Sequence, residues 1–251
     1  MAPKTKFIVW GIQRTGTIFL TTALDSHPDI LCIGEAFQNT DKPCNQDTSI
    51  LRYSQYIKQF MSRRLLNHIL RKQTVNKYLD YLYSLKNPGA IGFKLMLNQF
   101  KKYPCVIDRL KEDKTKVVHI HRTNILKTHV SSLRAKKTGV FFSSIATDPY
   151  KIHVPCENII DTLISLEAKN TLLKDTLNKY RLEHITVSYE KLTNNLSAET
   201  SKILCFLGMD NNIELKPQSH KITSDCLEDA VENYSEVIRS LSNTKYKSLL
   251  Q

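Results

Sequence analysis

The sequence lacks the patterns that mark several common protein classes. Six cysteines are spread along the chain, but none forms a C-x-x-C pair or has a histidine at the spacing of a zinc site. No apolar stretch is long enough to span a membrane, and residues 1–6 contain no apolar leader. We therefore expect a cytoplasmic protein without stable membrane insertion, in a reducing compartment, with Cys32 and Cys205 as buried thiols.

Acidic residues are scarce relative to basic ones. The chain has 24 Asp and Glu against 36 Lys and Arg, which gives a net charge of +12. Its 251 residues are 41% hydrophobic, so we expect residues 1–251 to form a single domain with one large core. The basic balance fits either a solvated surface or an anionic partner such as a nucleotide, a nucleic acid or a membrane face.

A strand, a turn and a helix are predicted over residues 7–20, which read FIVWGIQRTGTIFL. Gly11 and Gly16 have the spacing of the phosphate loop G-x-x-x-x-G-K-[ST]. Thr17, however, replaces the lysine of that motif, and Ile18 replaces its magnesium-binding hydroxyl. The start of the helix can therefore bind an anionic group, but the loop lacks the residues that handle a metal-bound nucleoside triphosphate.

The hydrophobic pattern predicts alternating strands and helices. Apolar, β-rich runs that indicate buried parallel strands lie at residues 7–10, 90–93, 116–121 and 184–188. Helical patterns lie at residues 17–26, 51–85 (as two helices), 159–180 and 197–207. This order predicts a three-layer α/β/α fold with a mainly parallel central sheet, in which ligands bind beyond the carboxyl ends of the strands.

Two helices have expected details that a structure can check. Ser197 is the expected N-cap of the last helix, and Gly208 is its expected stop. The helix at 159–180 has these expected core residues: Leu163, Leu166, Leu172, Leu173 and Leu177.

Glu35 and Lys94 are candidate catalytic residues. Glu35 follows an apolar run and Gly34 in a predicted loop, where a carboxylate near an anion site is suited to take a proton from a hydroxyl. Lys94 ends a strand and either faces the ligand crevice or extends to solvent. The alternative to a catalytic role for Glu35 is that it is a solvated surface charge. His27, which precedes Pro28, is better suited to bracing a turn than to acting as a base.

Arg122 and Ser131 are a candidate pair for a second anionic group. Arg122 leaves a strand end and Ser131 lies about two turns along the next helix. A forked guanidinium and a neutral hydroxyl suit a phosphate, although a surface arginine and a helix-face serine remain the alternative. His119, His121 and His129 do not predict a metal site, because strand alternation explains the first two and no carboxylate or cysteine completes a ligand set.

Together these motifs resemble the sulfotransferases that use 3′-phosphoadenosine 5′-phosphosulfate (PAPS) as donor, with a P-loop-like fold. The arrangement is closer to the bacterial carbohydrate-type and tyrosylprotein enzymes than to the cytosolic phenol and steroid enzymes. The resemblance runs in order from about residue 7 to 210, with a similar tail at residues 233–242. It rests on Arg14–Thr17, Ser26–Asp29, Gly34-Glu35, Gly92-Phe93-Lys94, Arg122 with Ser131, Tyr189–Leu192 and Phe206–Gly208.

The resemblance implies a role for each matching residue. Gln13, Arg14, Thr15, Gly16 and Thr17 match the loop that binds the 5′-phosphosulfate. Arg122 and Ser131 match the pair that binds the 3′-phosphate, Glu35 matches the general base, and Lys94 falls near the lysine that stabilises the transferring group. Three features depart from the pattern. Ile18 replaces a common threonine, the Arg122–Ser131 spacing leaves Ser132 as a substitute, and the basic, glycine-containing adenosine loop of the cytosolic enzymes is missing.

The resemblance implies metal-free, in-line sulfuryl transfer from PAPS to an acceptor hydroxyl, with Arg14 and Lys94 assisting Glu35. A carbohydrate or small molecule is favoured as acceptor, with residues 37–85 and 140–159 around it, and no nucleic-acid partner is expected. The oligomeric state is not predicted.

Two other functions are alternatives for this sequence. One is a kinase-like phosphotransferase with a phosphate loop, which the residues after Gly16 argue against. The other is a non-catalytic protein that binds nucleic acid or another polyanion through the basic region 58–77, which contains Arg63, Arg64, Arg71 and Lys72.

Overall fold

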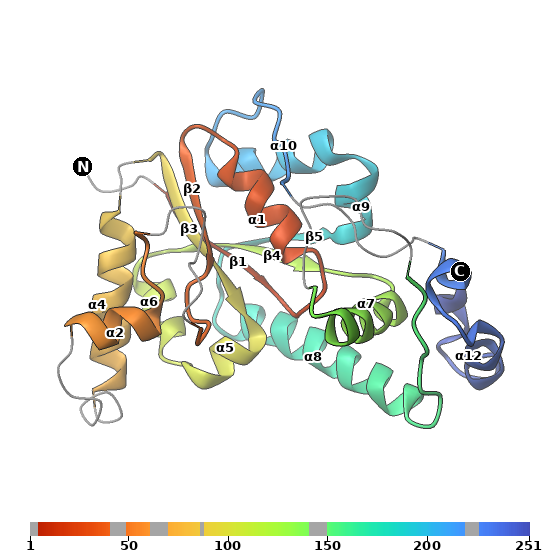
Figure 1. Ribbon diagram of the computed structural model, residues 1–251. Helices are drawn as coiled ribbons and strands as arrows, with labels where there is room; N and C mark the ends of the chain where they lie inside the picture. The colour runs from red at the N-terminus through yellow and green to blue at the C-terminus, as the bar shows by residue number, and fades with distance from the viewer. Residues whose placement is uncertain (1–4, 41–48, 61–69, 86–87, 141–149, 219–225) are drawn as a thin grey trace.

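The computed structural model describes residues 5–40, 49–60, 70–85, 88–140, 150–218 and 226–251. In this part of the chain, five parallel strands form one sheet in the order β2-β3-β1-β4-β5 (Figure 1). The strands are β1 (Thr5–Gly11), β2 (Ile30–Glu35), β3 (Ala90–Met96), β4 (Lys116–His121) and β5 (His184–Ser188). The predicted strands are confirmed. The edge strand β2 was not predicted, so Glu35 ends a strand instead of lying in a loop.

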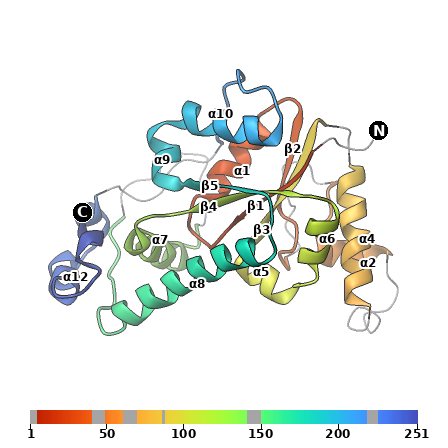
Figure 2. The same cartoon turned by 180° about the vertical axis from the view of Figure 1, so that it is seen from behind.

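Helices cover both faces of the sheet (Figures 1 and 2). One face packs against α1 (Thr17–Asp25), α9 (Tyr189–Asn194) and α10 (Leu196–Leu207). The other face packs against α2 (Tyr53–Phe60), α4 (Arg71–Ser84), α5 (Leu97–Lys102), α6 (Val106–Glu112) and α8 (Ile159–Lys179). Alternate residues of β1 supply the two cores, with Phe7 and Val9 facing α1 and Ile8 and Trp10 facing α8. The predicted three-layer α/β/α fold is confirmed.

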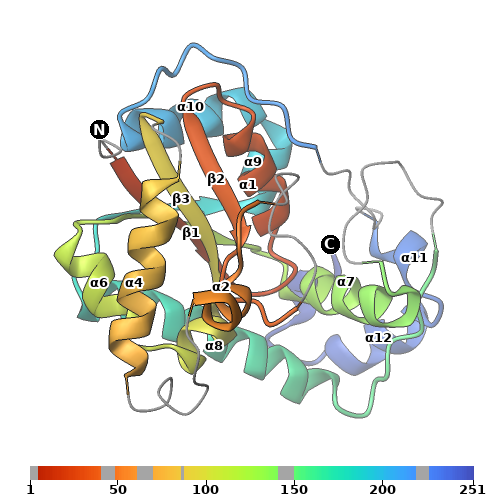
Figure 3. The same cartoon turned by 60° about the vertical axis from the view of Figure 1, so that its left-hand side comes forward.

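A third apolar core lies beside the sheet. It joins α7 (Ile125–Thr138) and the first turns of α8 to α11 (Leu227–Ala230), α12 (Tyr234–Leu241) and the terminal 3₁₀ turn η1 (Lys247–Leu250). Figure 3 shows α7, α11 and α12 grouped together, away from α4 and α6. None of the helices in the described ranges combines the length and the apolar character that a membrane span requires.

The structure corrects three of the expected details. Leu172 is 40% exposed, because α8 turns Leu173 and Leu177 inward. Asn195, not Ser197, caps α10, since its side chain accepts a hydrogen bond from the Ala198 N–H. Cys205 is exposed because Leu204 and Leu207 form the buried stripe of that helix, whereas Cys32 is buried as expected. Gly208 ends α10 in a left-handed conformation, as expected.

The motif around His27 braces the amino end of β2. His27 Nδ1 accepts a hydrogen bond from the Asp29 N–H (3.1 Å), so Nε2 carries the proton and faces the Asp210 carbonyl (3.3 Å). The Asp29 carboxylate accepts a hydrogen bond from the Gly89 N–H (2.7 Å). Glu35 lies at the opposite end of β2. His27 therefore braces a turn, as expected, and does not lie beside Glu35.

Candidate active site

All five strands bring polar residues to one edge of the sheet. Because the strands are parallel, their carboxyl ends meet at that edge, and the chain changes direction across the sheet between β1 and β4. In sheet order from β2 to β5, the residues are Glu35 on β2, Lys94 on β3, Arg14 after β1, Arg122 after β4 and Tyr189-Glu190 after β5. The sheet order therefore arranges these side chains as a row with the Glu35 carboxylate at one end and the Glu190 carboxylate at the other.

The loop after β1 presents the start of α1 to this edge. Gly16 is the N-cap residue, with φ at +84°, and contributes no capping side chain. A Cβ atom on Gly16 would lie 2.1 Å from the Tyr189 ring, so only glycine fits there. The Thr15 hydroxyl donates to the Ile12 carbonyl (2.8 Å) and closes the turn, while Gln13 is exposed. The backbone N–H groups of the first turn of α1 have no acceptor within the helix, and such groups can bind an anion.

Arg14 connects this loop to α7. Its Nε donates to the Ser131 hydroxyl at 3.0 Å, so Ser131, and not Ser132, is the serine that the structure brings to Arg14. Burial lowers the pKa of Arg14, and the positive charges of Arg122 and Arg134 lower it further, against the opposing effect of Tyr189. Arg122 and Arg134 are therefore close enough to Arg14 for their positive charges to act on it.

Arg122 is buried at the start of the turn between β4 and α7. Its Nη1 donates to the Lys127 carbonyl (3.2 Å), and its guanidinium carbon lies 5.2 Å from the centre of the Tyr189 ring. Its Nε lies 3.8 Å from a Glu190 carboxylate oxygen and has no hydrogen-bond partner among the described residues. Burial lowers the pKa of Arg122. The charge of this buried guanidinium is opposed by the nearby Glu190 carboxylate.

Glu190 holds the turn that carries Arg122. Its carboxylate accepts hydrogen bonds from the backbone N–H groups of Thr123 (3.0 Å) and Asn124 (3.3 Å). Burial acts to raise the pKa of Glu190, but these hydrogen bonds outweigh it and the net pKa is lowered. The sequence motif Tyr189–Leu192 is part of the resemblance but has no role assigned by it. The structure places Tyr189 against the loop that carries Arg14 and the turn that carries Arg122, and Glu190 against the second of these.

Glu35 and Lys94 form an ion pair at the other end of the row. Lys94 Nζ lies 2.8 Å from Glu35 Oε1. Lys94 is only 4% exposed, so the alternative prediction that its side chain extends to solvent is wrong. Burial lowers the pKa of Lys94, and Glu35 opposes that effect.

A β-bulge aligns Glu35 with Lys94. The register between β2 and β3 shifts between Ile33 and Glu35, so that Glu35 instead of Gly34 lies opposite Lys94. Strict alternation would place Glu35 on the same face as Ile33, the face that packs against α4 and α8. The extra residue turns Glu35 to the face of Lys94, as bulges beside functional sites commonly do.

Three further polar residues of this edge were missed in the sequence. Gln99 donates to Glu35 Oε2 at 2.8 Å, and Arg52 donates to the Glu35 backbone carbonyl. Arg134 lies one helical turn after Ser131, a spacing that places both on one face of α7. No motif indicates Gln99 or Arg52, because their partners are distant in the sequence.

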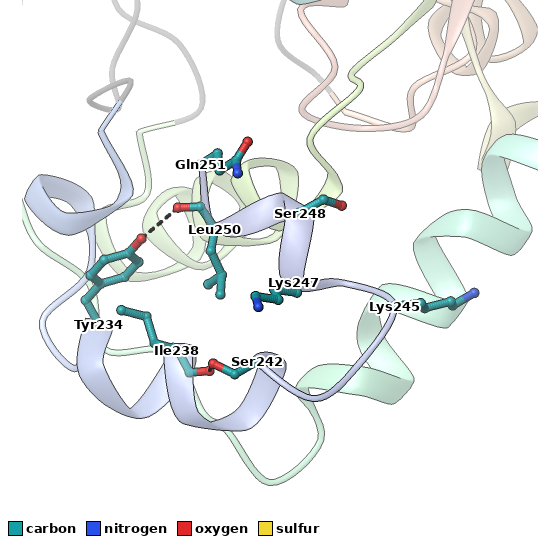
Figure 4. A pocket seen from close by; sticks show the side chains of 8 residues that line it. All are labelled: Tyr234, Ile238, Ser242, Lys245, Lys247, Ser248, Leu250 and Gln251. Carbon is teal, nitrogen blue, oxygen red and sulfur yellow. Dashed lines mark hydrogen bonds between the residues drawn. The ribbon is translucent and has the colours of Figure 1, made fainter.

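Other features lie apart from this row. Figure 4 shows a pocket between α12 and η1, lined by Tyr234, Ile238, Lys247 and neighbouring residues, where the Tyr234 hydroxyl donates to the Leu250 carbonyl (2.8 Å). No residue of the row lines it. In the basic region, Lys72 pairs with Asp108 at 2.9 Å, while Arg63 and Arg64 lie outside the described residues.

Comparison with known proteins identifies the family. The model of the Stf0 sulphotransferase family matches residues 97–236, more than half of the chain. Nodulation protein H of Rhizobium tropici is 25% identical over 207 residues, which cover 80% of this chain and 75% of that protein. A sulfotransferase structure from Alicyclobacillus acidocaldarius shares the fold, with a TM-score of 0.50 and 13% identity over 100% of this chain and 96% of that one. The chain therefore belongs to the Stf0 sulphotransferase family and is a sulfotransferase that takes its sulfuryl group from PAPS.

Proposed function

We propose that the row of residues at the sheet edge is the active site, with the donor bound across β1 and β4 and the acceptor hydroxyl beside Glu35. One observation carries this assignment. Cations that follow or lie on three adjacent strands, the buried Lys94 and Arg122 and the half-buried Arg14, converge on the edge where α1 begins, and the Glu35 carboxylate pairs with Lys94 at one end of the row.

The residues present suit the two anionic ends of the donor. The start of α1 with Arg14 suits the 5′-phosphosulfate, because backbone N–H groups and a guanidinium both stabilise negative charge there. Arg122 and Ser131 suit the 3′-phosphate, since a guanidinium and a hydroxyl both donate hydrogen bonds to phosphate oxygens and both side chains are buried at this edge. An anion between Arg14, Arg122 and Arg134 would also relieve the repulsion that lowers the pKa of Arg14.

The catalytic roles follow from charge and position. The bound donor supplies the sulfuryl group. Glu35 takes the proton of the acceptor hydroxyl, and general-base catalysis of this kind contributes roughly 10²–10⁴-fold to the rate. Lys94 and Arg14 stabilise the negative charge that develops on the transferring group and the leaving phosphate. Positioning and charge stabilisation are sufficient for this transfer, so we propose that no metal takes part and that a chelator leaves turnover unchanged.

The acceptor is proposed to be a hydroxyl of a carbohydrate or another small molecule. The Glu35 side chain is 24% exposed beside the buried Lys94, so the acceptor reaches a recessed carboxylate. Isotope-labelled PAPS offered with sugars, small alcohols and phenols, and a tyrosine peptide tests the class, with product mass as the readout. Labelled peptide without labelled sugar or small molecule would contradict the proposal.

Two variants separate the proposed roles. Glu35→Ala should lower kcat roughly 10²–10⁴-fold while leaving the affinity for the product, 3′-phosphoadenosine 5′-phosphate (PAP), unchanged. Arg122→Ala should weaken PAP binding about 10- to 100-fold, the range expected for hydrogen bonds to a charged group. Calorimetric titration with PAP and initial rates give both values, and exposed Glu183→Ala is the control. Normal turnover in Glu35→Ala, or unchanged PAP affinity in Arg122→Ala, would refute the corresponding role.

A further inference from the structure

We infer that Gln99 is a positioning residue that orients the carboxylate of Glu35. This inference rests on the proposed function, because it takes Glu35 as the base. Gln99 is 6% exposed and lies in the first turn of α5, directly after the strand that carries Lys94. Its Nε2 lies 2.8 Å from Glu35 Oε2, while Lys94 holds Glu35 Oε1 at 2.8 Å. Each carboxylate oxygen therefore has its own donor.

The orientation of the Gln99 amide follows from its second contact. The backbone N–H of Met96 lies 3.0 Å from Gln99 Oε1, and a backbone nitrogen can only donate. The amide oxygen must therefore face Met96, which leaves the NH₂ group to face Glu35. Two donors on two different oxygens fix the plane of the carboxylate. A carboxylate oxygen accepts about two hydrogen bonds, so each oxygen keeps capacity for the acceptor proton.

Gln99 also has a plain structural role, and the experiment must separate the two. A glutamine at the third position of a helix that accepts from the N-cap N–H is one half of a capping box. A glutamate serves this capping contact equally well, because its oxygen still accepts from Met96. Gln99→Glu therefore keeps the cap but replaces the donor to Glu35 with a second carboxylate. Gln99→Met removes both contacts at similar volume.

The charged and titratable groups around Glu35 bear on the pH dependence of kcat in the Gln99 variants. Lys94 of β3 faces its carboxylate, Arg52 binds its backbone carbonyl, and Arg14 and the Cys32 thiol lie near Lys94. None of these groups changes in the Gln99 variants. A donor to a carboxylate favours its ionised form, so its loss should move the acid limb of the kcat profile to higher pH. We expect about one pH unit for Gln99→Met and a larger shift for Gln99→Glu, where two carboxylates share the site.

The experiment measures kcat against pH, PAP affinity and melting temperature for the wild type and for Gln99→Glu, Gln99→Met and Asn98→Ala. Asn98 is the exposed neighbour of Gln99 on α5 and serves as control. We expect kcat at neutral pH to fall roughly 10- to 100-fold in both Gln99 variants, the loss typical of a misplaced catalytic group. PAP affinity should not change, and Gln99→Met added to Glu35→Ala should cause no further loss.

Different results overturn different claims. If both Gln99 variants keep wild-type kcat and an unmoved acid limb while Glu35→Ala is inactive, the positioning role is wrong and the base assignment stands. A lowered melting temperature in Gln99→Met with a wild-type profile in Gln99→Glu assigns Gln99 to helix capping alone and also overturns the inference. Normal turnover in Glu35→Ala refutes the proposed base, and the role of Gln99 fails with it.

Discussion

At the scale of single residues, Gly16 carries the tightest steric constraint of the site. Its backbone has φ at +84°, and the Tyr189 ring occupies the space that a side chain would need. Tyr189 in turn packs edge-on against Phe19 and lies under the Arg122 guanidinium. The contact between Gly16 and Tyr189 therefore joins the loop after β1 to the turn after β4.

Gly16→Ala should destabilise the protein and weaken PAP binding. Strain from a positive φ costs about 1–3 kcal/mol, and the overlap with Tyr189 adds to it. Gly139→Ala is the matched control, because Gly139 has φ at +69° but no atom of the described residues lies within 4 Å of its added Cβ. Urea unfolding and PAP titration compare the two. Equal losses of stability in both variants would show that the Tyr189 contact has no energetic weight.

At the scale of elements, the amino end of α7 depends on a carboxylate from α9. The Glu190 carboxylate accepts hydrogen bonds from the N–H groups of Thr123 and Asn124. The Asn124 side chain caps α7 by accepting a hydrogen bond from the Lys127 N–H. The Asn124 side chain also donates to the Leu249 carbonyl, which ties the terminal turn to the same point. The position of Arg122 therefore depends on contacts from three separate segments.

Glu190→Ala should lower the free energy of unfolding by about 1–3 kcal/mol, because two backbone N–H groups lose their acceptor. The lowered pKa of Glu190 means that its contribution is complete above the ordinary glutamate range and is lost as the pH falls through the folded value. The difference from wild type should thus shrink between pH 7 and pH 3. Urea titrations at both pH values measure it, with Glu183→Ala as control. A difference that does not depend on pH would contradict the assigned hydrogen bonds.

At the scale of the whole molecule, a buried histidine in the sheet couples stability to pH. Burial, followed by the charges of His121, Lys174 and His184, lowers the pKa of His119 to about 3. Its ring stacks on His121 with centres 5.7 Å apart. In the unfolded chain, His119 therefore takes up a proton near the ordinary pKa of histidine, whereas in the folded protein His119 does so only at a much lower pH. Stability should fall as the pH drops below about 6.5.

For one such group, the free energy of unfolding falls by about 1.4 kcal/mol per pH unit, or by about 2 kcal/mol between pH 6.5 and 5. His119→Gln should remove this component, so its free energy of unfolding should depend less on pH than that of wild type. The exposed His153 provides the control variant His153→Gln, which should follow the wild type. Parallel pH dependence in wild type and His119→Gln would show that His119 titrates normally.

The sequence by itself determined four of the five strands in the described sheet and several of the helices that cover it. Continuous apolar runs such as Phe7–Trp10 have no polar face, so they form strands buried on both sides, and alternation with helices makes the sheet parallel. Residues directly after such strands, including Arg14 and Arg122, could be placed at the ligand edge for the same reason. Their binding roles, like those of Glu35, Lys94 and Ser131, stay predictions that the variants above test.

Only the tertiary structure decided the local chemistry of the edge. Glu35 faces Lys94 because of a bulge, and a bulge depends on the register between two strands that lie far apart in the chain. Gln99 and Arg52 reach Glu35 through contacts between separate elements that leave no periodic signal. Burial of Lys94, Arg122 and Arg134 likewise depends on what packs over them. Sequence patterns record which residues face a core, but contacts between polar groups arise only when the packed elements fix their distances and orientations.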